Sequence, residues 1–445
     1  NCVLALTAGS LIACDLDLKN PNAPNDVEVT TTTDGVIALA TGLQARFSTS
    51  YFSFAYMAGV VTDELAATAA AFISISDAEQ GAIPPGTAIA NDVFNNIYRT
   101  VRTADDLLAG TVALADQFEP GTRSGLRALA FALKAESLGE ALQSYQRIPV
   151  ETYGVATPVY VGRAEALTVV RALLDSAANE IATTPPSALF NNSILTPGVS
   201  LSNMIQLFRA RYARIANDNA TALAASNLVA RTGAGAFSLL TYPGSANPFN
   251  TVTGGTNGVA PRRGWRLSMD PGDQRFVWFV SPSTTLFGRI QTTPLDPWAR
   301  YATAGNPFPV YFPDEALLIK AEALANQNAL AQAQAVLDSV RTDCTGGRGL
   351  DDPKACLPAL SSPLSQSQLL AEIYKQRRYE LFATGSRWED ARRRSLVRGP
   401  VAAPSLPLDA QRCWLPYATG DRNANPNVPP DPAEPTSFPS GCPLQ

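Results

Sequence analysis

Apolar residues recur every three or four positions along most of the chain, the spacing that gathers them on one face of an α-helix. The repeat is clearest after Tyr311, where it predicts a helical hairpin over 311–341. Two more helices follow, one through Leu370 and Phe382 and a short one that ends at Arg394. The same spacing predicts earlier helices at 34–64, 91–108, 123–145, 163–183 and, as a pair, across 201–231.

Small residues mark the contact face of the predicted hairpin. Ala321, Ala325, Ala329 and Ala333 would let two helices approach closely, as stacked helical-repeat pairs require. Helix pairs with short turns also recur through 34–236. We therefore expect a mainly α fold, a tetratricopeptide-like helical-repeat superhelix whose repeats are degenerate in sequence.

The helical pattern is lost between residues 237 and 310. Gly, Thr, Pro, Asn and Trp dominate this segment, which predicts a long irregular, loop-rich insert with a few short strands, such as one at 275–280. Loops of this length in a compact protein are usually functional. The insert is therefore the expected ligand-binding part of the chain.

The first residues are typical of an export signal. Residues 1–13 are apolar, and Leu11-Ile12-Ala13-Cys14 matches the lipobox of bacterial lipoproteins, whose cysteine is acylated. We expect 1–13 to be the remnant of a signal peptide, Cys14 to be lipidated, and the Asn- and Pro-rich segment 14–33 to be an extended tether. The alternative is a buried first helix or strand that contains a free cysteine.

Cysteine usage fits the same compartment. With Cys2 in the signal and Cys14 lipidated, four of the six cysteines remain, an even number that suggests two disulfides in an exported protein. Nearest-neighbour pairing gives Cys344–Cys356 and Cys413–Cys442, the second of which would pin the Pro-rich tail. A zinc site is the alternative, and the lack of CxxC spacing and of histidine disfavours it.

Charge and composition exclude several classes of function. The formal net charge is −5, which gives no electrostatic case for nucleic acid or anionic lipid, and the absence of histidine removes Ser–His–Asp and Cys–His catalysis. Asp63 and Glu64 could be taken as the acid pair of a glycosidase, but neighbouring residues rarely share a cleft in the needed geometry. No phosphate loop or metal-ligand cluster is present in the sequence. We expect no enzyme activity, no cofactor and no metal.

Two segments carry a resemblance to a known family. DEALLIKAEALA, starting at Asp314, and EIYKQRRYELFATGSRWEDARR, starting at Glu372, resemble the C-terminal half of the SusD/RagB family. The recurring positions of that family are met by Glu322, Arg377, Arg378, Glu380, Leu381, Gly385, Arg387, Trp388, Asp390 and Arg393. Gln376 and Thr384 stand where the family usually has Glu. Earlier in the chain, Phe94 stands where the family has a Trp.

The resemblance implies a fold and a function. Members are surface lipoproteins that bind glycans at the outer membrane of Gram-negative bacteria and cap a TonB-dependent transporter of the SusC type. It implies one SusD-like unit, with an N-terminal helical-repeat region at 34–236, the insert at 237–310, and C-terminal helical hairpins with a disulfide-pinned tail at 311–445. The expected ligand is an oligosaccharide or another nutrient.

Carbohydrate binding needs flat apolar faces for sugar C–H groups, with planar polar side chains beside them for the hydroxyls. The candidates that could meet this need are Trp265, Trp278, Trp298, Tyr301 and Arg266 in the insert, with Asp63 and Phe94 on the first helices. We expect the ligand to bind where the insert meets those helices. Each loop aromatic could instead pack the insert onto the helical region.

Two other functions remain open from the sequence. A helical-repeat scaffold that binds protein would need a continuous groove without an aromatic platform, and an α-helical glycosidase would need two carboxylates across one cleft. Trp388 is expected to be structural and to lock the last helices, whereas the run Arg392 to Arg394 is expected to be a solvated helix end.

Overall fold

The computed structural model describes residues 30–232, 238–240, 247–253, 258–290, 293–344, 352–394, 412–433 and 442. The expected signal remnant, the lipidated Cys14 and most of the tether lie outside the described residues. Within them the fold is mainly helical, as predicted. No helix among these residues has both the length and the apolar character of a membrane span.

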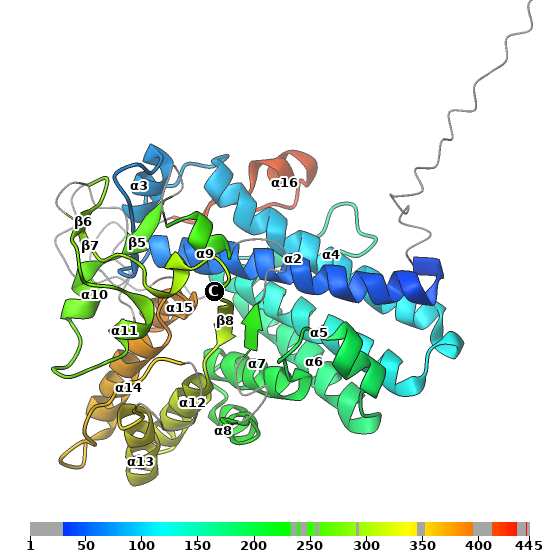
Figure 1. Ribbon diagram of the computed structural model, residues 1–445. Helices are drawn as coiled ribbons and strands as arrows, with labels where there is room; N and C mark the ends of the chain where they lie inside the picture. Colours follow the sequence, from blue (N-terminus) through cyan, green and yellow to red (C-terminus); the bar gives the residue numbers. More distant parts are fainter. Residues whose placement is uncertain are drawn as a thin grey trace, which may run out of the picture.

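The N-terminal region is built from helices that pack side by side in chain order (Figure 1). They are α2 (Thr33–Val60), α4 (Ala88–Ala113), α5 (Pro120–Ser144), α6 (Arg163–Thr183), α7 (Leu201–Ile215) and α8 (Asn219–Asn227). Each contacts the next, and α2 also contacts α5. The predicted helices are confirmed, and their pairing is the one that helical repeats use to bury a continuous core.

Local chemistry explains how the central helix α5 begins and how closely it packs. Pro120 occupies its first turn, and the Glu119 carboxylate accepts hydrogen bonds from the backbone N–H groups of Gly121 and Thr122. Gly139 faces Tyr212 of α7, and a Cβ at this glycine would lie 1.7 Å from the Tyr212 hydroxyl. The missing side chain therefore sets the distance between α5 and α7.

The C-terminal helices continue the stack. They are α12 (Pro313–Asn326), α13 (Leu330–Arg341), α14 (Gln366–Glu380) and α15 (Ser386–Arg393). α12 packs on α8 and on α13 and α14, which encloses a second apolar core. Ser365 and Gln368 form a capping box at the start of α14. The predicted hairpin and both later helices are confirmed.

Trp388 is structural, as predicted, but the expected solvated end at Arg392 is wrong. The Trp388 ring is buried and its Nε1 donates to the Arg412 carbonyl at 2.7 Å. Arg392 is also buried, because its guanidinium pairs with Glu389 and donates to the Cys413 and Gln143 carbonyls. The side chain therefore joins three segments instead of facing water.

The insert consists of short elements at one end of the helical stack (Figure 1). Its helical turns are α9 (Pro248–Thr251), α10 (Arg263–Leu267), α11 (Phe276–Phe279) and η4 (Arg300–Ala302). Its strands pair in antiparallel fashion, β4 (Ser238–Leu240) with β8 (Phe308–Tyr311) and β6 (Leu286–Phe287) with β7 (Pro294–Leu295). β5 (Val259–Pro261) pairs with β1 (Leu65–Ala67) of the N-terminal region. A further pair, β2 (Ile148–Pro149) with β3 (Tyr160–Val161), lies outside it.

The strand expected at 275–280 is wrong. The apolar run Phe276–Phe279 forms the single helical turn α11, closed by a hydrogen bond from the Val280 N–H to the Phe276 carbonyl at 2.8 Å. A strand would need a neighbouring strand along its length, whereas this turn pairs the Phe276 carbonyl within itself and the Phe279 carbonyl with the Ala299 N–H. Only Val280 pairs in strand fashion, as a bridge to Trp298.

Outside the insert, three further elements of at least five residues fell in stretches where no helix was predicted. They are α3 (Ile73–Glu79), the π-helical turn η2 (Phe190–Ile194) and α16 (Thr419–Ala424). All are too short to show two turns of apolar periodicity, which is why the sequence did not mark them.

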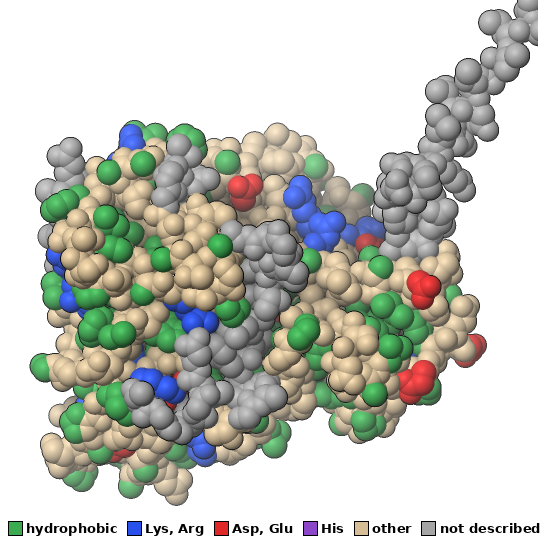
Figure 2. All heavy atoms as spheres, viewed as in Figure 1, with side chains coloured by type: hydrophobic (Ala, Val, Ile, Leu, Met, Phe, Trp, Pro, Cys, Tyr) green, Lys and Arg blue, Asp and Glu red, His purple; other side chains and the backbone are tan. Residues whose placement is uncertain are grey.

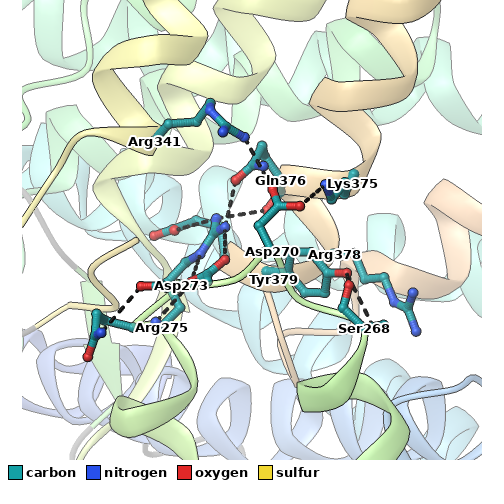
Figure 3. A network of polar contacts seen from close by, with 12 residues as sticks. Ser268, Asp270, Asp273, Arg275, Arg341, Lys375, Gln376, Arg378 and Tyr379 are labelled. Carbon is teal, nitrogen blue, oxygen red and sulfur yellow. Dashed lines mark hydrogen bonds and ion pairs between the residues drawn. The ribbon is translucent and has the colours of Figure 1, made fainter. Parts of the chain in front are cut away.

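Polar networks attach the insert to the C-terminal helices. Arg275 is fully buried, and its guanidinium donates hydrogen bonds to both carboxylate oxygens of Asp273 (Figure 3). Its Nη2 also donates to the Gln376 Oε1 of α14 at 2.6 Å. In the same view Asp270 pairs with Lys375 and Arg341. The insert is thus held in place by α13 and α14.

Both predicted disulfides are present, Cys344–Cys356 and Cys413–Cys442. The segment around Cys413 lies in the core, where the Leu415 N–H donates to the Ser144 carbonyl of α5 at 2.8 Å. The tail is therefore part of the packed fold at its start and is linked covalently near the end of the chain.

Candidate ligand-binding site

One pocket in the described residues combines aromatic rings from several elements. It encloses about 400 Å³ and lies where α2, α3 and α4 meet α9 of the insert. Its lining consists of Phe52, Ser53, Tyr56, Met57, Phe72, Ser74, Ile75, Ala88, Ile89, Asp92, Val93 and Val252. A larger pocket of about 530 Å³ between α6 and α7 is lined by no aromatic ring. The aromatic pocket is the better candidate because flat apolar faces are what sugar rings require.

The inner wall of this pocket is supported by a chain of stacked rings. Phe52 and Tyr56 are one helical turn apart on α2, with ring centroids 5.7 Å apart. Phe249 of α9 contacts Phe52 edge-on at 5.0 Å and stacks on Tyr301 at 4.9 Å. Such packing fixes the ring positions before any ligand arrives.

The outer wall carries apolar groups that face water. Phe72 precedes α3 and is 53% exposed, and the neighbouring Ile73 is 64% exposed. Exposed apolar groups that gather beside a pocket mark interaction sites more often than single ones do. Phe72 therefore offers an accessible aromatic face at the mouth of the pocket.

Polar groups in the lining are few and come from α2, α3 and α4. Asp92 is exposed, and none of the described cations lies within ion-pair distance of its carboxylate. Ser53 is held in place, because its hydroxyl donates to the Thr49 carbonyl at 3.0 Å and accepts from the Asn96 amide at 2.8 Å. Asp92 is thus the one charged side chain in the lining.

Three of the aromatic candidates do not face solvent as expected. Trp265, Trp298 and Tyr301 are 1%, 5% and 0% exposed. Each indole N–H finds a buried carbonyl, that of Trp265 at Arg378 (3.1 Å) and that of Trp298 at Val259 (2.9 Å). The rings pack the insert onto the helical region, the alternative that the sequence left open.

Asp63 and Arg266 are engaged in ion pairs. Asp63 is buried between Arg387, at 2.7 Å, and Arg378. Burial alone would raise the pKa of Asp63, but the two guanidinium groups outweigh it and hold the pKa below its usual value. Arg266 pairs with the buried Asp296 at 2.6 Å. Neither side chain lines the aromatic pocket.

Phe94 lies just behind the pocket. Its ring is buried and stacks on Tyr98 at 4.4 Å and edge-on to Tyr145 at 5.6 Å, while its neighbour Val93 lines the pocket itself. Phe94 is therefore placed to support the wall of the pocket, not to contact a ligand directly.

Trp278 borders a separate pocket of about 460 Å³. It is half-buried, and the Arg300 guanidinium lies 3.9 Å from its ring centroid. The other polar residues of the lining are Gln274, Asn306, Asp352 and Lys354. This pocket shares no lining residue with the aromatic pocket. The structure thus does not bring Trp278 together with the other predicted site residues.

The residues that line the aromatic pocket were mostly missed from the sequence. Phe52 and Tyr56 lie beside the apolar stripe that predicted α2, which uses Tyr51 and Phe54. A second aromatic pair four residues apart, off the buried stripe, is the signal that could have pointed to them. Phe72 carried no such signal, since its helix was not predicted.

Comparisons with known proteins agree with the mainly helical fold described above. The SusD family model matches residues 256–428. No curated protein matches the chain. A SusD superfamily protein from Bacteroides thetaiotaomicron VPI-5482 shares 16% identity over 91% of this chain and 100% of its own, with a TM-score of 0.70.

Two further solved structures show the same likeness. A SusD homolog from Bacteroides thetaiotaomicron VPI-5482 shares 13% identity, covers 92% of this chain and 99% of its own, and has a TM-score of 0.70. Surface glycan-binding protein A from Bacteroides uniformis shares 14% identity, covers 88% and 99%, and has a TM-score of 0.64. The chain therefore has a SusD-like fold, and its residues 256–428 match the SusD family model.

Proposed function

We propose that the protein binds glycans in the aromatic pocket between α2, α3, α4 and α9. The observation that carries this proposal is the pocket itself, in which Phe52, Tyr56 and Phe72 surround a space of about 400 Å³ beside a free carboxylate. Sugar rings present C–H faces that pack on such rings and hydroxyls that bond to polar groups at the rim. Support also comes from the structural likeness to a surface glycan-binding protein.

The match of residues 256–428 to the SusD family supports a place at the cell surface. We propose that Cys14 is lipidated, that 14–33 tethers the protein to the outer membrane, and that the protein delivers its glycan to a SusC-like TonB-dependent transporter. The unit that does so would be the whole chain, with 34–236, 237–310 and 311–445 as parts of one fold. The buried insert aromatics and the Asp63 ion pair would act indirectly, by holding the walls of the pocket.

The test begins with a glycan array on the soluble protein, followed by calorimetry with the glycan that binds. We expect a dissociation constant in the micromolar to millimolar range, because polar groups on both partners must shed water. Replacing Phe72 by Ala should weaken binding by roughly tenfold or more, corresponding to about 1 to 3 kcal/mol for a large aromatic face. The ring is exposed, so the fold should persist.

Matched variants locate the site. Tyr153→Ala removes another exposed aromatic ring, one that lines neither pocket, and should bind as the parent does. Trp278→Ala tests the second pocket. If Phe72→Ala binds normally and Trp278→Ala does not, the site lies at Trp278. If none of the printed glycans binds the parent protein, a protein-binding scaffold becomes the better hypothesis.

A further inference from the structure

The charge distribution around the aromatic pocket bears on which glycans it accepts. Asp92 lies on α4 with its carboxylate exposed, and the rest of the lining is uncharged. Elsewhere many carboxylates of the fold are neutralised, as Glu79 is by Arg262, Asp390 by Arg377 and Asp296 by Arg263. Asp92 has no such partner in the described part of the chain. A negative charge at the pocket is thus available to a ligand.

We infer that Asp92 makes this pocket selective for neutral sugars over uronate, sulfated or phosphorylated ones; this rests on the proposed glycan-binding function. An ionised carboxylate is an acceptor only, with two oxygens that can take up the hydroxyls of one sugar residue in charge-assisted hydrogen bonds. The same charge repels an anionic substituent brought into the pocket. One residue therefore both binds the neutral ligand and disfavours the acidic one.

The neighbouring backbone fits a polyhydroxylated ligand as well. α4 begins at Ala88 and has no side-chain hydrogen bond at its cap, Thr87. The N–H groups of Ala90 and Asn91 already donate to the Thr87 carbonyl, which leaves those of Ala88 and Ile89, two residues of the lining, to donate to a ligand. Taken alone, this helix end would favour an anion. Asp92, one turn further along the same helix, offsets that field and leaves a site with donors and an acceptor but no net positive charge. A neutral sugar hydroxyl can use both.

The test uses a printed array that carries glucose, galactose and mannose oligosaccharides beside their uronate and sulfated counterparts of the same linkage. The parent protein should bind neutral members better than acidic ones, and the difference should shrink between about 0.05 and 0.5 M salt because an exposed charge is screened. Asp92→Asn should lower affinity for the best neutral glycan by about tenfold and should abolish the discrimination.

Two further variants separate charge from shape. Asp92→Glu keeps the charge but moves it, so discrimination should persist while affinity for the neutral glycan falls. Glu165→Gln removes an exposed carboxylate of α6 that lines neither pocket, and it should change nothing.

The outcomes test separately whether Asp92 sets the selectivity and whether the protein binds glycans at all. If the parent binds neutral glycans but treats uronates equally, or if Asp92→Asn leaves their ratio unchanged, the role of Asp92 is refuted and glycan binding stands. If no array member binds the parent, both fail. If Glu165→Gln changes the ratio as much as Asp92→Asn, the effect comes from net charge and not from the pocket.

Discussion

Arg387 holds both carboxylate oxygens of Asp63, a residue 324 positions earlier in the chain, through its Nε at 2.7 Å and its Nη2 at 3.2 Å. Both side chains are buried, and Arg378 completes the cluster. The contact joins the end of the first long helix, α2, to α15 near the end of the fold. One ion pair therefore joins the first and the last parts of the fold.

Removing one member of this cluster should be costly. Asp63→Ala leaves the buried guanidinium of Arg387 and the half-buried one of Arg378 without their carboxylate. We expect the free energy of unfolding to fall by about 3 to 5 kcal/mol in a denaturant titration. Asp106→Ala breaks a surface pair with Arg102 and should cost less than about 1 kcal/mol. Since the pKa of Asp63 is lowered in the fold, this contribution is fully present above the unfolded pKa of about 3.9 and is lost as pH falls from there through the lower folded pKa. Equal losses in the two variants would contradict the buried pair.

Glu64 should make stability depend on pH in the opposite sense. Burial, with a smaller contribution from the Asp63 carboxylate, raises the pKa of Glu64 to about 8. The folded state then holds a proton that the unfolded state releases near pH 4.5, so stability falls as pH rises from about 4.5 to about 8.

Replacing this carboxyl by an amide removes the titration. Glu64→Gln should match the parent near pH 4.5 and exceed it by a few kcal/mol near pH 8.5, as measured by denaturant unfolding at both pH values. A parent and a variant whose stabilities run parallel across this range would show that Glu64 titrates normally.

Two glycines should respond to alanine in opposite directions. At Gly139 a Cβ would lie 1.7 Å from the Tyr212 hydroxyl, so Gly139→Ala should lower stability by about 1 to 3 kcal/mol or more through overpacking. At Gly42, inside α2, a Cβ meets no atom within 4 Å, and Gly42→Ala should raise stability by about 0.5 to 1 kcal/mol. Thermal unfolding of both variants measures the contrast, and a destabilised Gly42→Ala would be the outcome to explain.

The two disulfides should contribute unequally. In the chain-entropy treatment, closing loops of 12 and 29 residues is worth about 3 and 3.5 kcal/mol. We expect Cys413→Ser with Cys442→Ser to lower the unfolding free energy more than Cys344→Ser with Cys356→Ser. Peptide mapping without reduction checks the pairing in the native protein. Crossed pairs or free thiols would refute it.

The helices could be predicted because each carries its own apolar stripe, which is a local signal. Residues 163–183 illustrate this, since the predicted bounds coincide with those of α6. The short α11 could not be told from a strand, because a run of four apolar residues has no period.

The site was harder to predict because its residues lie far apart in the sequence and come together only in the fold. The buried Trp265 ring packs on Phe382, and its N–H donates to a carbonyl 113 residues away. No spacing in the sequence encodes these contacts. Phe52, Phe72, Asp92 and Val252 come from four segments that converge only in the folded protein. The general location, where the insert meets the first helices, remains a prediction that the binding variants will test.

The joining of α2 to residues near the end of the chain also has a kinetic consequence. The Tyr51 hydroxyl bonds to the carbonyls of Val310 and Thr384, 259 and 333 residues away, and Arg387 closes on Asp63. An emerging chain that stops short of α15 has no partner for these buried groups, so the N-terminal helices cannot complete their core during synthesis. We expect contact order, more than helix propensity, to limit the rate of folding. A nascent chain that stays incompletely folded until its last helices are synthesised would also remain in the unfolded state that passage through an export channel requires.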